Sequence, residues 1–485
     1  MIGKVLKANL AYAIGSVANS AALFLLIPYL VNALTPEEYG AWSLFEIGTL
    51  FLKWLILAGL DIGLMRGYWY REGEEERARL VGTALIAVVM WGGGLIGLLG
   101  AVLFVKGRSW DFPGAPYTLE LTLVIGLLEA VFALLLTVFR IREEAFTFVA
   151  LSVERMVGFL GLSIGLVQAG GGLAGALAGR LLAGALSLGA AVALGRRYLI
   201  LKPDWTGLRR MARYGLPLLP TNLASYVLFA SDRYVLQHFS TLEMVGIYSF
   251  AYKIATTLDI LITRPFALDW APRRFKIARS DDAPQRYAHV LILYLFAGLL
   301  FALLVVAITP TIYTWIAPPL YRQGMSVVPI ILAAYLVYGL GYPLNVGIML
   351  RDKTEYAPLI GGVAAALCLG LNFWWIPRYG MMGAAWATLL AYAVRTGGLA
   401  WVSLRLYPVP YSLRSVLLVG LGALLGYGGV VGVEKIMSGD EILGLPIKLG
   451  WVLLVFATVA YGLLRQAMLP AAFWRGRREG AGPPR

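Results

Sequence analysis

The chain has 485 residues, of which 59% are hydrophobic and only 14% are charged, and its formal net charge is +14. Soluble domains carry roughly 45–50% apolar and about 25% charged residues. This composition excludes a water-soluble enzyme and a disordered chain, and it favours a polytopic membrane protein. The basic residues are dispersed in short loops, so the positive charge does not indicate a nucleic-acid partner.

About fourteen segments are long and apolar enough to cross a membrane, which takes about 20 residues each. The sequence therefore predicts an all-α membrane protein. The first segment is too long for a signal peptide, and another apolar segment follows it at once. In chain order the predicted spans are 8–33, 41–65, 81–105, 117–139, 145–168, 173–195, 214–238, 245–268, 287–309, 324–350, 356–376, 380–404, 412–433 and 446–468.

The loops alternate in their content of Lys and Arg. Most of these residues lie in alternate loops, with dense groups at 196–213 and 273–286. Cytoplasmic loops carry the excess of Lys and Arg, so both termini are expected in the cytoplasm. The same residues are candidates for contact with anionic lipid headgroups.

Two pairs of segments resemble each other at nearly equal offsets of 206 and 208 residues. LTPEEYGAWSLFE at 34–46 aligns with STLEMVGIYSFAY at 240–252, and GLAGAL at 172–177 aligns with GMMGAA at 380–385. Each offset is about six spans, an even number, so the two halves cross the membrane in the same direction. Such halves are related by an axis along the membrane normal. The sequence predicts two six-helix lobes in a pseudo-twofold relation, plus two extra helices.

The repeat predicts a division of the chain into lobes, linker and appendix. Two parallel lobes that face each other enclose a cleft that can open to either side, which is the geometry of alternating access. The predicted parts are an N-lobe at 1–195, a cytoplasmic linker at 196–213, a C-lobe at 214–404, extra spans within 405–468 and a cytoplasmic tail at 469–485.

Several collinear stretches are similar to one known family. They are LTPEEYGAWSLF at 34–45, ASDRYVLQHFSTLEMVGIYSFAYKI at 230–254, RDKTEYAPL at 351–359 and NFWWIPRYGMMGAAWATLLAYAV at 372–394. They resemble the polysaccharide transporter, or oligosaccharide flippase, family of the multidrug/oligosaccharidyl-lipid/polysaccharide exporter superfamily. The resemblance implies export of an undecaprenyl-diphosphate-linked oligosaccharide across the cytoplasmic (inner) membrane. It also implies contact with membrane lipid and with polysaccharide assembly proteins.

Charged residues inside the predicted spans are the candidate site residues. An ionised side chain at mid-bilayer costs about 2.5–3.5 kcal/mol on insertion scales, so it should face a cavity or a partner. A diphosphate needs fixed positive charge to cross hydrocarbon. The candidate substrate-binding residues are Lys53, Lys253, Arg264, Arg180 and Arg155. In the structural alternative, these residues pair with Glu46, Asp259 or Asp269, or extend to an interface.

Coupling to Na⁺ or H⁺ would need a carboxylate in the cavity, and Asp259, Glu46 and Glu129 are the candidates. The repeat offset maps Lys53 onto Asp259. Asp232 and Arg233 are candidates for a gate or inter-lobe pair, with a local helix–helix pair as the alternative. No phosphate-binding loop of the G-x-x-x-x-G-K-[ST] type occurs, so ATP is not expected. No cofactor is predicted apart from Na⁺ or H⁺ as the coupling ion.

Three alternatives to this function stay open. A flippase for the peptidoglycan precursor lipid II shares the fourteen spans. A multidrug exporter of the same superfamily would favour twelve spans and a cavity dominated by carboxylates. A membrane glycosyltransferase would need an acidic metal motif or a large external loop, so a transporter rather than an enzyme is expected.

Overall fold

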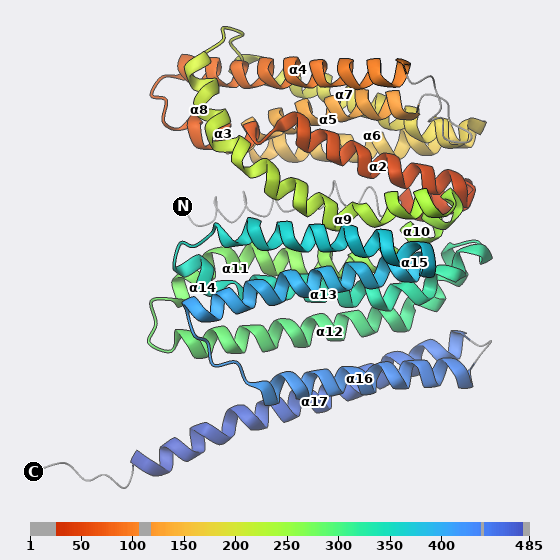
Figure 1. Cartoon of the computed structure of the whole chain (residues 1–485), viewed down its shortest axis with the longest axis vertical. Helices are drawn as coiled ribbons and strands as arrows, with labels where there is room; N and C mark the ends of the chain where they lie inside the picture. The colour runs from red at the N-terminus through yellow and green to blue at the C-terminus, as the bar shows by residue number, and fades with distance from the viewer. Residues whose placement is uncertain (1–25, 106–117, 438–440, 479–485) are drawn as a thin grey trace, which may run out of the picture. The chain divides into compact units, whose positions relative to one another are not determined.

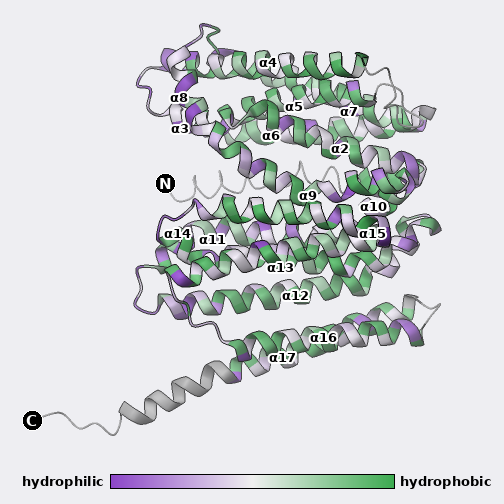
Figure 2. Ribbon diagram, in the orientation of Figure 1, coloured by the Kyte–Doolittle hydropathy of each residue, from purple (hydrophilic) through white to green (hydrophobic). Residues whose placement is uncertain are grey.

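The computed structural model describes residues 26–105, 118–437 and 441–478 (Figure 1). Within these ranges every regular element is a helix. Apolar residues run along the helices, and polar residues gather near their ends (Figure 2). Helices suit a membrane because they satisfy all their backbone hydrogen bonds internally. The prediction of an all-α polytopic membrane protein is confirmed.

Ten helical stretches of the described chain are long and apolar enough to cross a membrane. Two of them, Ala145–Tyr198 and Tyr356–Leu406, double back at a glycine and each contain two predicted spans. The helix Leu219–Phe239 supplies one more. Together these helices account for every predicted span after the first. Most of the first predicted span, 8–33, lies outside the described residues.

The first compact unit contains the chain up to Phe250 and the short segment Ile316–Pro318. A cluster that includes Ile56, Leu64, Ala84 and Leu134 forms an apolar core. The helices of this unit are α2 (Pro36–Leu57), α3 (Leu60–Tyr68), α4 (Glu74–Val105), α5 (Thr118–Ile141), α6 (Ala145–Leu166), α7 (Gly172–Gly195), α8 (Trp205–Gly215), α9 (Leu219–Phe239) and the first part of α10 (Leu242–Leu258).

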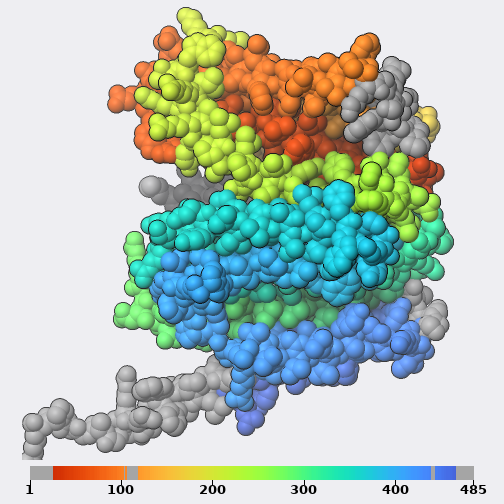
Figure 3. Space-filling view, in the orientation of Figure 1, coloured from red at the N-terminus to blue at the C-terminus, as the bar shows by residue number. Residues whose placement is uncertain are grey.

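The second compact unit contains Ala251–Trp315 and the chain from Pro319 onward. Side chains of α12, α16 and α17 share an apolar cluster, which includes Ala307, Val430 and Phe456. Figure 3 shows the outer surface of this unit in green to blue. After the end of α10, the helices of this unit are α11 (Arg264–Ile277), α12 (Ala283–Ile316), α13 (Val328–Leu344), α14 (Val346–Leu350), α15 (Tyr356–Leu406), α16 (Leu413–Ile436) and α17 (Glu441–Arg478).

The division between the units falls at Phe250, whereas the predicted linker between the lobes is 196–213. The predicted C-lobe begins with α9, but α9 packs with α2 in the first unit, where Tyr226 and Ala230 contact Ile47. The expected linker is also not a simple loop, because it contains most of helix α8.

The repeat has direct structural counterparts near the starts of α2 and α10. Thr35 caps α2 by accepting from the Glu38 amide, and Thr241 accepts equivalently from the Met244 amide. Ser43 Oγ donates to Ser249 Oγ at 2.7 Å, across 206 residues. A contact between equivalent residues is what a twofold relation produces. The two copies of this motif are therefore locally equivalent within the first unit.

Two glycines, Gly40 and Gly246, allow α2 and the start of α10 to touch. A Cβ on Gly40 would lie 2.0 Å from the Leu242 carbonyl oxygen, and a Cβ on Gly246 would lie 2.0 Å from that of Pro36. The repeat offset of 206 residues relates these two contacts to each other, because it takes Gly40 to Gly246 and Pro36 to Leu242. Only glycine permits such a close approach of two backbones.

The second repeated motif forms two helical hairpins with the same turn. Gly172 has φ 49° and ψ −137°, and Gly380 has φ 53° and ψ −131°. In the first hairpin Gly179 approaches the backbone of Ser163, and in the second Gly398 approaches the side chain of Ile360. Gly172 and Gly380 both adopt a backbone conformation that L-residues rarely reach. Each motif therefore reverses the chain between two spans.

Candidate functional site

Four charged side chains from four helices meet inside the first unit. Glu129 of α5 accepts from Arg180 Nη2 of α7 at 2.7 Å, and Arg155 Nη2 of α6 lies 3.0 Å from the same carboxylate oxygen. Lys53 Nζ of α2 lies 3.8 Å from the other oxygen. We call these four residues the Glu129 cluster.

Close helix packing beside the Glu129 cluster brings its members together. A Cβ on Gly126, one turn before Glu129, would lie 2.8 Å from Leu52 Cβ, so α5 approaches α2 next to Lys53. Gly179 would place a Cβ 2.5 Å from the Ser163 backbone, so α7 approaches α6 next to Arg180. Small residues at helix contacts permit this in membrane proteins.

Aromatic rings contact two of the guanidinium groups. Arg155 lies 4.5 Å from the centre of the Phe132 ring, and Arg180 lies 5.5 Å from that of Phe45 and 5.6 Å from that of Phe159. Such contacts stabilise a cation where water is scarce. They hold the guanidinium groups in place without neutralising their charge.

The Glu129 cluster carries more positive than negative charge. Three cations share one carboxylate, and the four side chains are only 10% to 25% exposed. A surplus of partly buried positive charge is unfavourable unless an anion compensates it. The charge balance of the cluster would therefore suit a multivalent anion.

The predicted partners of these cations are partly wrong. Lys53 and Arg180 were expected to pair with Glu46, Asp259 or Asp269 if their role is structural, but both contact Glu129. Lys53 and Glu129 are 76 positions apart in sequence, and only packing of α2 on α5 makes them neighbours. Glu129 itself is a predicted carboxylate, and the structure makes it the shared counter-ion.

The other predicted pair of charges lies in the second unit. Arg264 Nε donates to Asp259 Oδ2 at 2.8 Å, across the π-helical turn Asp259–Thr263. Asp259 is 8% exposed, whereas the Arg264 side chain is 58% exposed. The pairing of Arg264 with Asp259 agrees with the structural alternative. Lys253 and Glu46 are half-buried on α10 and α2.

Asp232 and Arg233 form local contacts. Asp232 accepts from the Tyr248 hydroxyl at 2.6 Å and from the Arg233 amide at 2.9 Å. Arg233 Nη1 donates to the Phe229 carbonyl at 3.0 Å. These contacts join α9 to α10 within the first unit, which favours the local helix–helix pair over the gate.

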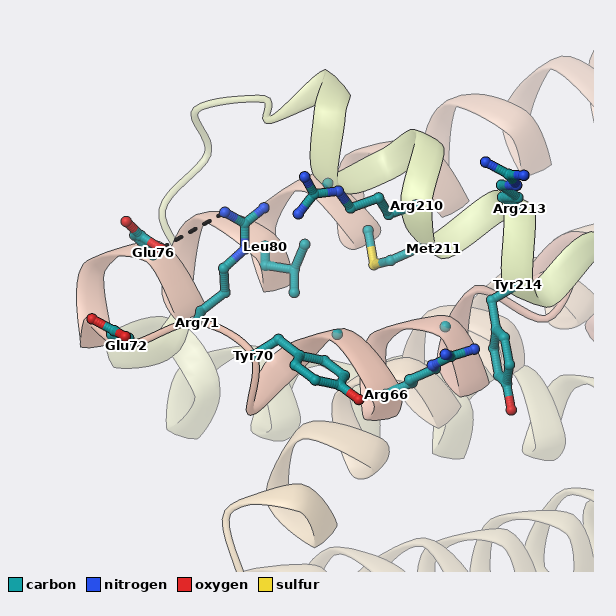
Figure 4. A pocket seen from close by; sticks show the side chains of 13 residues that line it. Arg66, Tyr70, Arg71, Glu72, Glu76, Leu80, Arg210, Met211, Arg213 and Tyr214 are labelled. Atoms are coloured by element: carbon teal, nitrogen blue, oxygen red, sulfur yellow. Dashed lines mark ion pairs between the residues drawn. The ribbon is translucent and has the colours of Figure 1, made fainter.

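Sequence reasoning missed a pocket between α3, α8 and the start of α4, lined by Arg66, Arg210, Arg213 and Tyr214 among others (Figure 4). From the sequence, Arg210 and Arg213 are topology determinants and candidates for contact with anionic lipid headgroups, but no pocket is predicted around them. The sequence signal for this pocket is the spacing of small and apolar residues in the segment 205–215. Gly207, Met211 and Gly215, which are buried in the structure, recur there every four positions. That spacing is typical of a helix lying against a neighbour.

Residues 5–278 match the family described as polysaccharide biosynthesis protein, which is more than half of the chain. The chain belongs to this family, which confirms the resemblance to polysaccharide transporters. A search of curated proteins finds no significant match.

Solved structures share the fold. A lipid II flippase, MurJ, in an inward closed conformation matches with a TM-score of 0.70 and 13% identity, covering 95% of this chain and 99% of that one. A multidrug resistance MATE family transporter of the MOP superfamily matches in its inward-facing conformation with a TM-score of 0.57 and 17% identity, covering 82% and 98%. In its outward-facing conformation, such a transporter matches with a TM-score of 0.56 and 15% identity, covering 83% and 95%. The chain therefore shares the fold of solved structures that are described as a flippase and as transporters.

Proposed function

We propose that the protein is a flippase that moves an undecaprenyl-diphosphate-linked oligosaccharide from the cytoplasmic to the outer leaflet of the inner membrane. The observation that carries this proposal is the surplus of positive charge in the Glu129 cluster. A diphosphate is the multivalent anion that such a lipid carries. Both termini then lie in the cytoplasm, and polysaccharide assembly proteins are the expected partners.

In this mechanism the diphosphate competes with Glu129 for Arg155, Arg180 and Lys53. Guanidinium groups bind phosphate oxygens through paired hydrogen bonds, and Lys adds a compact point charge. Alternating access of the two lobes then exposes the glycan on the other side, while the lipid tail stays in the bilayer. Glu129, once released from its cations, becomes a candidate for taking up H⁺ or Na⁺ as the coupling ion.

A lipid II flippase is the second candidate, favoured by the TM-score of 0.70 to a protein of that description. Its substrate carries the same diphosphate, so the Glu129 cluster does not separate the two. The surplus positive charge argues against export of cationic drugs, because like charges repel.

The test is translocation of a fluorescent undecaprenyl-diphosphate oligosaccharide by purified protein in proteoliposomes. Lys53→Gln and Arg180→Gln should each slow translocation about tenfold or more, because each loses a charge-assisted contact. Lys253→Gln, in the same assay, tests the predicted site residue of the second unit. Arg279→Gln, at an exposed loop position, is the matched control and should behave as wild type.

Three results would contradict the proposal in different ways. Normal translocation by both cluster variants would retain the flippase and remove the Glu129 cluster as its diphosphate site. Translocation of a lipid II analogue alone would select the second candidate. Uptake of a cationic drug without movement of any lipid-linked glycan would remove the flippase itself.

A further inference from the structure

The pocket between α3, α8 and the start of α4 has a volume of about 860 Å³. Figure 4 shows α3 on one side and α8 on the other, with Arg66 and Tyr70 facing Arg210 and Arg213 across the space. Four arginines and two glutamates line it, so cations outnumber anions.

Only one of these arginines is neutralised by carboxylates. Arg71 Nη2 contacts Asp204 Oδ2 at 2.7 Å, and its Nη1 lies 3.7 Å from Glu76. Arg66, Arg210 and Arg213 form no ion pair with any residue in the described part of the chain. The three free cations therefore give the pocket an anion-binding character.

The cations are held on a rigid frame. A Cβ on Gly63 would lie 2.6 Å from the Met211 carbonyl oxygen, and one on Gly59 would lie 2.5 Å from that of Gly215, so α8 is docked directly on α3. Asp204 caps α8 by accepting from the Gly207 amide at 2.9 Å. A preformed site avoids the ordering cost of binding.

The pocket has the features of a membrane interface. Helix α8 buries Gly207, Met211 and Gly215 and leaves Trp205 72% exposed. Trp69 and Tyr70 beside the pocket are 60% and 79% exposed. Exposed Trp and Tyr next to basic residues are typical of the headgroup layer. Tyr214 also stacks on Arg66, whose guanidinium lies 4.3 Å from the ring centre.

We propose that this pocket binds the phosphate headgroup of an anionic membrane phospholipid, at a site separate from the Glu129 cluster. Arg66, Arg210 and Arg213 contact the phosphate. Basic pockets on the cytoplasmic side of membrane proteins bind such headgroups. A lipid bound here joins α3 to α8, and so secures the segment that connects the two repeats.

The experiment is a titration of the full-length purified protein with phosphatidylglycerol, followed by native mass spectrometry. Phosphatidylcholine, which is zwitterionic and has no net charge, is the comparison lipid, and farnesyl diphosphate and inorganic pyrophosphate are the other two ligands. The double variant Arg66→Gln/Arg210→Gln removes two pocket cations. Arg209→Gln is the matched control, because Arg209 is exposed on the same helix but does not line the pocket.

Wild type should retain one phosphatidylglycerol more tightly than phosphatidylcholine, and the double variant should bind it about tenfold or more weakly. Arg209→Gln should bind as wild type. The thermal unfolding of the double variant in detergent checks that it is folded. Where it is not, Arg210→Gln alone replaces it, with a smaller expected loss in the same direction.

Four outcomes would overturn the proposal. Equal retention of both phospholipids, or an equal loss in Arg209→Gln, would show non-specific surface attraction. Tighter binding of farnesyl diphosphate, lost in the double variant, would reassign the pocket to the polyprenyl carrier. Equally tight binding of pyrophosphate would show that the ligand is a soluble phosphate.

Discussion

Asp232 and Arg233 are adjacent on α9, and both are almost completely buried, with 1% and 3% exposure. The carboxylate has two donors, the Tyr248 hydroxyl and the Arg233 amide. A buried ion pair is seldom a large net source of stability, but removal of one partner leaves an uncompensated charge. The pair therefore makes the α9–α10 contact sensitive to substitution.

Asp232→Ala should lower the free energy of unfolding by about 3–5 kcal/mol, because the Arg233 charge loses its buried partner. Tyr248→Phe should lower it by about 1.5–3 kcal/mol, since only one hydrogen bond to a charged group is lost. Thermal or denaturant unfolding in detergent measures both. Tyr379→Phe is the control, because Tyr379 is 63% exposed and should change nothing. An equal loss for Asp232→Ala and Tyr379→Phe would contradict this account.

At the scale of elements, the α6–α7 hairpin and the two halves of α15 show how the repeat is built. Gly172 and Gly380 share one backbone conformation, although they are 208 residues apart. Gly175 and Gly383 follow them at equivalent positions, so both the motif and the backbone geometry of the turn are repeated. Hairpins of this kind return the chain through the membrane without exposing unpaired backbone groups to lipid.

Gly172→Ala and Gly380→Ala should each lower the free energy of unfolding by about 1–3 kcal/mol, because alanine is strained at positive φ. A Cβ at Gly380 meets nothing within 4 Å, so strain is the only expected cause there. Gly370→Ala in the same helix also meets nothing within 4 Å and should be neutral or slightly stabilising. Unfolding followed by tryptophan fluorescence measures the free energy of unfolding of the three variants. A lower free energy of unfolding for only one of Gly172→Ala and Gly380→Ala would argue against equivalent turns.

At the scale of the whole molecule, the distribution of Lys and Arg predicts one orientation in the membrane. The single cysteine, Cys368, is buried with 0% exposure, so it offers little background for chemical labelling. Arg279 and Arg322 are both exposed, and they lie in loops predicted on opposite sides. This pair provides a direct test of topology.

In a Cys368→Ser background, Arg322→Cys should react with a membrane-impermeant maleimide added to intact cells. Arg279→Cys should react only after the membrane is permeabilised, because its loop is predicted to be cytoplasmic. The unmodified background protein is the negative control. The reverse pattern would invert the orientation and move the pocket beside α8 to the outer face.

The sequence alone was sufficient for the features that depend on local pattern. Runs of about 20 apolar residues identify spans, because the bilayer sets the length of a helix. The two matched motifs identified the repeat. In the structure Ser43 and Ser249, which the repeat aligns, form a hydrogen bond, and Gly172 and Gly380 adopt the same backbone conformation. The family also followed from short collinear motifs, and the match to residues 5–278 confirms it.

The tertiary structure decided which charges meet. Lys53, Glu129, Arg155 and Arg180 were all candidates, but their common contact depends on glycines that let four helices approach. The pocket beside α8 likewise needs α3 and α8, which are far apart in sequence. A hydropathy pattern is a property of consecutive residues, so the sequence alone reveals it. An ion pair acts across space, over a few ångströms, and helix packing alone sets that distance.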